Sequence, residues 1–149
     1  MAEMQPLQGI IPYVVTPVHA DGSVNLPVFI DQIRYLLDEG VQGICVLGSS
    51  GEFPYLSESQ CETLVACAVQ EVAGRVPVIA GVSGFSTHVM QKAARRYAEL
   101  GADALVIMPN QYFPLKQESL VSLYGELATV VHPLPIVLYT NPKYMHFDL

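Results

Sequence analysis

Basic residues are scarce in this chain of 149 residues: seven Lys and Arg stand against fourteen Asp and Glu, which gives a formal net charge of −7. Binding to a nucleic acid or to an anionic membrane surface requires clustered positive charge, so the composition argues against both partners. No run approaches the roughly 20 consecutive apolar residues of a membrane-spanning helix. Residues 1–8 lack the basic start and apolar middle of a signal peptide, and we therefore expect a cytoplasmic protein.

Cysteine is also scarce. Cys45, Cys61 and Cys67 are odd in number and show no Cys-x-x-Cys spacing, so neither a disulfide framework nor a zinc site is expected. They lie in apolar segments, where buried free thiols are expected. The four histidines are scattered without ligand spacing. The sequence thus predicts neither a metal nor a cofactor.

Apolar runs, by contrast, recur through the chain, of which 51% is hydrophobic and 14% charged. No linker or change of composition divides it, and we expect one domain over residues 1–149. Five runs are too continuous for a strand with one face in water, which is typical of parallel strands covered on both faces. These runs are Gly9–Thr16, Gly43–Leu47, Val76–Val82, Ala104–Met108 and Pro135–Thr140.

Four segments with apolar residues at helical spacing separate the five runs. Ser57 and Gln60 have the spacing of a capping box, and Ser86 is a predicted N-cap. Gly40 and Gly101 stand where helices are expected to end. The apolar faces run from Leu26 to Leu37, from Leu64 to Val72, from Met90 to Ala98 and from Leu120 to Val131.

This strict alternation predicts an α/β fold with a parallel sheet and right-handed crossovers. Two architectures satisfy it: an open doubly wound sheet, and a (β/α)8 barrel cut off after its fifth strand. The pattern alone does not choose between them. In both architectures the functional site forms at the carboxyl ends of the strands, so the candidate site residues are those that follow the predicted strands.

Two of these strand ends carry groups suited to chemistry. The loop Gly48-Ser49-Ser50-Gly51-Glu52 combines glycines, which permit tight backbone geometry, with hydroxyls that can hold a small carboxylate or phosphate. It matches neither the phosphate-loop pattern nor the dinucleotide-binding pattern. Tyr139 ends the fifth run, and its phenol is expected near the mouth of the sheet, where hydroxyl contacts would let it pass protons.

Three motifs in register with the strand and helix period resemble the dihydrodipicolinate synthase and N-acetylneuraminate lyase family of Schiff-base aldolases. They are the loop at Gly48, the segment Gly9-Ile10-Ile11-Pro12 with Thr16-Pro17, and Leu138-Tyr139-Thr140-Asn141-Pro142. The resemblance covers the whole chain. It implies a (β/α)8 TIM barrel, truncated here to about five strands and four helices. It also implies lyase or synthase chemistry on pyruvate or a related 2-keto acid, which is held as an imine on a lysine of the sixth strand.

The resemblance assigns roles by position. Ser49 and Ser50 would hold the keto-acid carboxylate and join a hydroxyl relay, and Tyr139 would move protons. The lysine is expected about 25 to 30 residues beyond Tyr139, past Leu149. The 149 residues alone are therefore expected to be inactive, because an imine needs an amine nucleophile. The full-length form is expected to be a homo-oligomer.

Two further positions depart from family members that make dihydrodipicolinate. Those enzymes carry Tyr-Tyr after the proline that ends the fourth strand, and the second Tyr reaches into a neighbouring subunit. Here Tyr112 would replace it only with a one-residue shift of the loop. They also place an arginine five residues after the fifth-strand tyrosine, where this chain has Tyr144, and a neutral phenol cannot form the bidentate ion pair of an arginine. The resemblance thus favours 2-keto-acid chemistry over aspartate-semialdehyde specificity.

Two alternatives from other functional classes stay open at this point. The chain could be a non-catalytic fragment that associates through the exposed edges of its outer strands. It could instead be an open-sheet phosphate or nucleotide binder that uses the Gly48–Gly51 loop.

Overall fold

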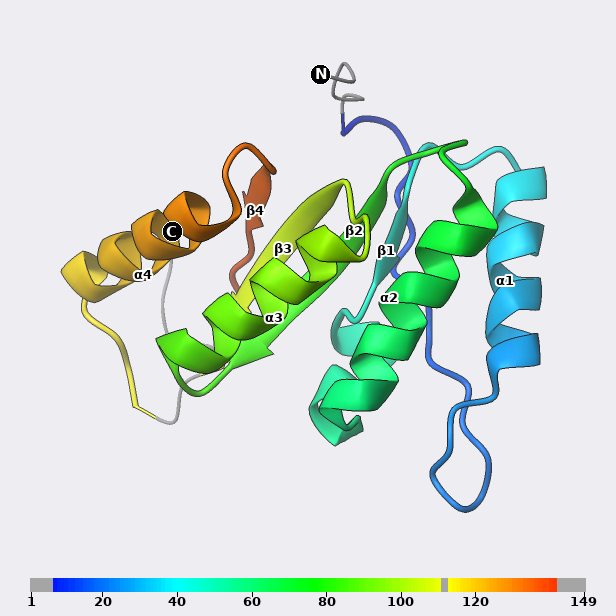
Figure 1. Ribbon diagram of the computed structural model, residues 1–149, viewed down its shortest axis with the longest axis horizontal. Helices are drawn as coiled ribbons and strands as arrows, with labels where there is room; N and C mark the ends of the chain where they lie inside the picture. The colour runs from blue at the N-terminus through cyan, green and yellow to red at the C-terminus, as the bar shows by residue number, and fades with distance from the viewer. Residues whose placement is uncertain (1–6, 111–112, 142–149) are drawn as a thin grey trace.

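Strands and helices alternate in the computed structural model, which describes residues 7–110 and 113–141 (Figure 1). Two short 3-10 helices, Ser49–Gly51 and Phe53–Tyr55, follow the first strand. Within the described residues the strands are β1 (Ile44–Val46), β2 (Val78–Gly84), β3 (Ala104–Pro109) and β4 (Ile136–Leu138), and the α-helices are α1 (Leu26–Asp38), α2 (Glu58–Val72), α3 (Thr87–Glu99) and α4 (Gln117–Val131).

The strands form one parallel sheet in the order β1-β2-β3-β4, which is also their order along the chain. Successive strands are therefore neighbours, and one helix connects each pair. Figure 1 shows α2 and α3 in front of the sheet, with α1 and α4 flanking them. The predicted parallel sheet with helical crossovers is confirmed.

The two faces of the sheet are covered differently. A large hydrophobic cluster joins the outward-facing strand residues to the helices, through side chains such as Ile33, Leu64 and Leu127. The other face, here called the inner face, has a small cluster built from strand residues alone: Cys45, Ile79, Ala104, Val106 and Met108. It is covered by Leu7, Ile11, Phe53 and Tyr139, none of which belongs to an α-helix.

This one-sided covering decides between the two predicted architectures. A doubly wound sheet carries helices on both faces and reverses its strand order at a switch point. Here the order runs in one direction and the helices pack on one face, as in the wall of a (β/α)8 barrel. The described residues therefore form part of a barrel wall and not an open doubly wound sheet.

The first predicted strand, Gly9–Thr16, is not a regular strand. It runs parallel to β1 but forms only an isolated bridge, between Tyr13 and Cys45. The backbone N–H of Cys45 donates to the Pro12 carbonyl oxygen and that of Val14 to the Cys45 carbonyl oxygen, both at 2.9 Å. Pro12 has no N–H to donate, which interrupts the ladder. Over the described residues, four strands and the bridge at Tyr13 therefore take the place of the five predicted strands.

The predicted helix ends are largely confirmed. The Ser57 hydroxyl accepts from the backbone N–H of Gln60 while the Gln60 side chain accepts from the backbone N–H of Ser57, which completes the capping box. The Ser86 hydroxyl caps α3. Gly40 and Gly101 directly follow the C-caps of α1 and α3 with φ of +76° and +95°, values that glycine adopts without strain.

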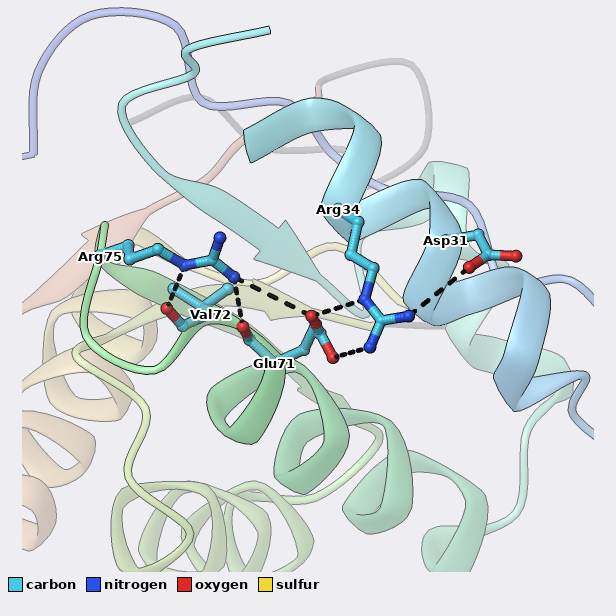
Figure 2. Close-up of polar contacts among 5 residues, drawn as sticks. All are labelled: Asp31, Arg34, Glu71, Val72 and Arg75. Atoms are coloured by element: carbon cyan, nitrogen blue, oxygen red, sulfur yellow. Dashed lines mark hydrogen bonds and ion pairs between the residues drawn. The ribbon is translucent and has the colours of Figure 1, made fainter. Parts of the chain in front are cut away.

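A charged network joins the ends of α1 and α2 (Figure 2). The Arg34 guanidinium donates to both carboxylate oxygens of Glu71, at 2.9 and 3.1 Å. Arg75 donates to the Glu71 and Val72 carbonyl oxygens and so satisfies two acceptors at the end of α2. Because α2 ends where the chain turns back toward the start of β2, the network lies at the edge of the sheet opposite to the carboxyl ends of the strands, and it serves stability.

The first prediction concerns this network. Hydrogen bonding by Arg34 lowers the pKa of the Glu71 carboxyl. A lowered folded-state pKa gives stability that is fully present above the unfolded-state pKa of about 4.3 and is lost as the pH falls through the folded-state value. We expect Glu71→Gln to be less stable than wild type at neutral pH, with the difference vanishing in strong acid. Urea unfolding across that range measures it, and Glu39→Gln, at the exposed C-cap of α1, is the control. An equal difference at every pH would contradict the assignment.

A glycine allows β2 to approach the end of β1. A Cβ on Gly81 would collide with the carbonyl oxygen of Leu47 and would lie 2.7 Å from its carbonyl carbon and 2.8 Å from Cε of Met108. Real Cβ atoms do not come so close to backbone. The position of the loop that follows β1 therefore depends on the absence of a side chain at position 81.

The second prediction follows from this contact. Gly81→Ala should lower the free energy of unfolding by about 1–3 kcal/mol, as overpacking does in tight interiors. The control is Gly125→Ala on the exposed face of α4, where a Cβ would meet nothing within 4 Å, and where alanine should add about 0.5–1 kcal/mol of stability. Thermal unfolding of both variants measures the contrast. Equal effects of the two substitutions would overturn the packing argument.

Candidate active site

The carboxyl ends of the parallel strands lie at one edge of the sheet, and polar residues follow them there. Ser49 and Ser50 follow β1, Ser83 lies at the end of β2, and Asn110 follows β3. Tyr139 comes directly after β4. The strand-end positions that the sequence singles out are thus at the same edge of the barrel wall.

The backbone holds the serine loop in a defined shape. Leu47 and Glu52, which flank it, have φ of +59° and +54°, a conformation that costs a non-glycine residue roughly 1–2 kcal/mol. The Gly51 N–H donates to the Gly48 carbonyl oxygen at 3.0 Å. Gly48 lies against the ring of Tyr13, where a Cβ would come within 2.9 Å of Cε1. The glycine at position 48 therefore makes room for a protein side chain.

Ser49 and Ser50 are exposed, and neither hydroxyl has a hydrogen-bond partner among the described residues. Ser49 lines a cavity of about 280 Å³ together with residues from the ends of β2 and β3, among them Ser83, Met108 and Asn110. The Ser83 hydroxyl is buried and, within the described part of the chain, unpaired. The cavity thus offers hydroxyl groups that are free to form hydrogen bonds. This is unusual for the buried Ser83 hydroxyl, because buried polar groups are nearly always hydrogen-bonded.

Tyr139 lies on the inner face. Its side chain is half-buried and packs against the inner-face cluster that includes Met108, which also lines the Ser49 cavity. Its backbone is held from both sides, since its N–H donates to the Ile107 carbonyl oxygen at 3.2 Å and its carbonyl oxygen accepts from the Tyr124 hydroxyl at 3.5 Å. Tyr139 and Ser49 are therefore on connected surfaces, although no direct contact joins them in the described structure.

Sequence reasoning assigned no role to two residues of this site. Ser83 directly follows the predicted strand Val76–Val82, a position at which site residues were expected. Tyr13 lies within an apolar run, where a tyrosine reads as an ordinary strand residue. In the structure it faces the inner side and lines a second cavity, of about 300 Å³, with Cys45, Val106 and Val137 among its neighbours.

Tyr13 and Cys45 are neighbours on the inner face. Their backbones form a bridge, and both side chains line the 300 Å³ cavity. Burial, followed by the influence of Cys45, raises the pKa of Tyr13 to about 12, and Tyr139 contributes to the same shift. Burial likewise raises the pKa of the Cys45 thiol to about 12. Both groups therefore keep their protons at neutral pH.

Two tyrosines considered in the sequence, Tyr112 and Tyr144, lie outside the described residues. Cys45 and Cys61 are buried free thiols as expected, whereas Cys67 is partly exposed. Over residues 7–110 and 113–141, no three His, Cys, Asp or Glu side chains gather as metal ligands. None of the helices described is both long and apolar enough to cross a bilayer.

Curated relatives match most of this chain with about half of their own length. A DapA-like lyase of Halobacterium salinarum, itself uncharacterized, is 39% identical over 137 residues, which are 92% of this chain and 45% of that protein. The 4-hydroxy-tetrahydrodipicolinate synthase of Polynucleobacter asymbioticus is 36% identical over 137 residues, which are 91% of this chain and 44% of the synthase.

Solved structures give the same result. A candidate dihydrodipicolinate synthetase from Pseudomonas aeruginosa superposes with a TM-score of 0.92 at 35% identity, over 97% of this chain and 49% of that one. An Escherichia coli K12 prophage protein of the dihydrodipicolinic acid synthase family, solved in complex with pyruvate, gives a TM-score of 0.89 at 31% identity, over 94% of this chain and 47% of that one. These likenesses confirm the predicted truncated barrel.

The model of the dihydrodipicolinate synthetase family matches residues 6–149, nearly the whole sequence. The match includes the serine loop, Tyr139 and the first apolar run, the motifs on which the resemblance was based. This chain belongs to the dihydrodipicolinate synthetase family.

Proposed function

We propose that this chain is the N-terminal half of a carbon–carbon lyase or synthase that acts on pyruvate or a related 2-keto acid through an imine. The observation that carries the proposal is the common position of Ser49, Ser83 and Tyr139 at one end of a barrel wall. The family membership and the pyruvate complex of a structural relative support the substrate class.

The serine hydroxyls suit the carboxylate of a 2-keto acid. Ser49 and Ser50 are exposed at a helical turn and lack partners among the described residues, so a ligand does not have to displace an existing hydrogen bond. Hydroxyl and backbone N–H groups in such turns bind small anions. In the proposal both serines bind the carboxylate, and Ser49, which lines the cavity, also belongs to the catalytic relay.

Tyr139 is the proposed proton-transfer group. Imine formation releases water from the substrate carbonyl and a lysine amine, and each step moves a proton to or from an oxygen or nitrogen. A phenol on the inner face is suited to this exchange when hydroxyls connect it to the reacting carbon. Tyr112 is a further candidate for the relay. The lysine would come from a later strand, and the complete protein is proposed to be a homo-oligomer.

The third prediction tests the imine directly. Pyruvate with borohydride should add a covalent mass to a longer protein that continues this segment to the expected lysine, because reduction fixes the imine as a stable amine. The 149-residue chain should gain no such mass. Intact-mass and peptide mass spectrometry measure both outcomes. Lys143 lies four residues after Tyr139 in the sequence, and an adduct there would overturn the assignment of roles. A longer protein that contains the expected lysine but is never modified would overturn the proposed function.

The fourth prediction separates the proposed roles. In a protein that forms the imine, Tyr139→Phe should lower the turnover rate by about 10²–10⁴-fold, the usual contribution of a general acid or base. Ser50→Ala should instead raise the pyruvate concentration needed for half-maximal rate, because it removes a carboxylate contact. Tyr35→Phe and Ser122→Ala, at exposed positions of α1 and α4, are the controls. Unchanged turnover in Tyr139→Phe would remove Tyr139 from the mechanism.

A further inference from the structure

Tyr13 stands between the two parts of the candidate site. It belongs to the first apolar segment, and its backbone bridges to Cys45 of β1. Tyr13 is 40% exposed, whereas the next residue, Val14, is only 4% exposed and belongs to the core. The exposed part lines the 300 Å³ cavity on the inner face, so the ring has access to the interior of the barrel wall.

The ring of Tyr13 touches the serine loop. Its edge lies against Gly48, the residue before Ser49, so closely that any side chain at position 48 would collide with Cδ1 and Cε1. The ring therefore fills the space beneath the start of the loop. Because Gly48 is immediately followed by the 3-10 turn of Ser49–Gly51, a change in ring position changes where the serine hydroxyls are presented.

The Tyr13 side chain also lies on the same inner face as Tyr139. Tyr13 and Cys45 line one cavity, and Tyr139 packs against the inner-face cluster that contains Cys45. Tyr139 also contributes to the raised pKa of Tyr13. A single aromatic side chain thus contacts the loop after β1 and shares the inner-face cluster with the residue after β4.

We propose that Tyr13 is a positioning residue of the candidate site, whose ring sets the serine loop and whose hydroxyl orients the phenol of Tyr139. The proposal rests on the proposed function for its catalytic meaning, since it assigns Tyr13 to the keto-acid site. It does not require Tyr13 to touch the substrate. Its geometric content stands separately: the ring of Tyr13 lies against Gly48, and Tyr13 and Tyr139 both lie beside Cys45 on the inner face.

The first measurement uses NMR on the 149-residue chain with ring-labelled tyrosine. Tyr13→Phe keeps the ring but removes the hydroxyl, so the ring resonances of Tyr139 should shift more than those of any other tyrosine. Tyr35→Phe, at an exposed position of α1, is the matched control and should leave the Tyr139 resonances in place. Tyr139 resonances that do not move in Tyr13→Phe would overturn the proposal.

A measurement on the unchanged chain guards against a variant that does not fold. Nuclear Overhauser contacts should join the ring protons of Tyr13 to the α-protons of Gly48. Their absence in the folded wild-type chain would overturn the proposal without any substitution.

The last measurement separates this proposal from the proposed function. In the longer protein used for trapping, Tyr13→Phe should slow modification by pyruvate and borohydride about tenfold, since a misplaced proton donor loses part of its contribution. The pyruvate concentration for half-maximal rate should stay unchanged. If the wild type is trapped and Tyr13→Phe is trapped at the same rate, the result counts against the role of Tyr13 alone. Absence of trapping in the wild type counts against the proposed function, and the NMR result still decides the placement of Tyr13.

Discussion

The packing of every described α-helix on one face of the sheet is the constraint on which the rest of the structure depends. Parallel strands in chain order, joined by α-helices on one side, give a wall whose other side has to be filled by strand and loop residues. That filling includes Cys45, Ile79 and Met108 of the strands, together with Tyr13 and Tyr139.

The two edges of the wall have different physical characters. The edge where α2 ends is fixed by a bidentate pair between Arg34 and Glu71 and by Arg75 on the last carbonyls of the helix. The opposite edge has serine hydroxyls without partners among the described residues. Stabilising interactions and unused hydrogen-bonding capacity are thus separated across the molecule, as is usual for barrels that bind ligands at the carboxyl ends of their strands.

Much of the fold could be predicted from the sequence because local signals agreed with the global pattern. The capping box of Ser57 and Gln60 and the continuous apolar runs depend on neighbours in the chain, and both are found as expected. The first apolar run does not form a regular strand, because Pro12 interrupts its hydrogen bonding with β1. The partner strand, and therefore this interruption, cannot be recognised from the local sequence. Whether the helices cover one face or both depends on the order in which successive strands are added to the sheet. The alternation of strands and helices left this order open, and the family motifs predicted the barrel.

The candidate site was only partly predictable, for a related reason. Ser49, Ser83 and Tyr139 all lie at the ends of predicted strands, where the site was expected, but the sequence does not show that Ser83 lines a cavity with Ser49. Tyr13 matters because Gly48 approaches its ring in space, and a sequence read one segment at a time does not contain that information.

The strained backbone on either side of the serine turn has a consequence for recognition. Leu47 and Glu52 hold left-handed conformations, and the buried side chain of Leu47 ties one end of the turn to the hydrophobic core. A small anion would then meet a surface that is already shaped, and the entropy lost by ordering the loop would not weaken its association. Such a turn is suited to discriminating among ligands by fit, since it does not readily remodel itself around a poor one.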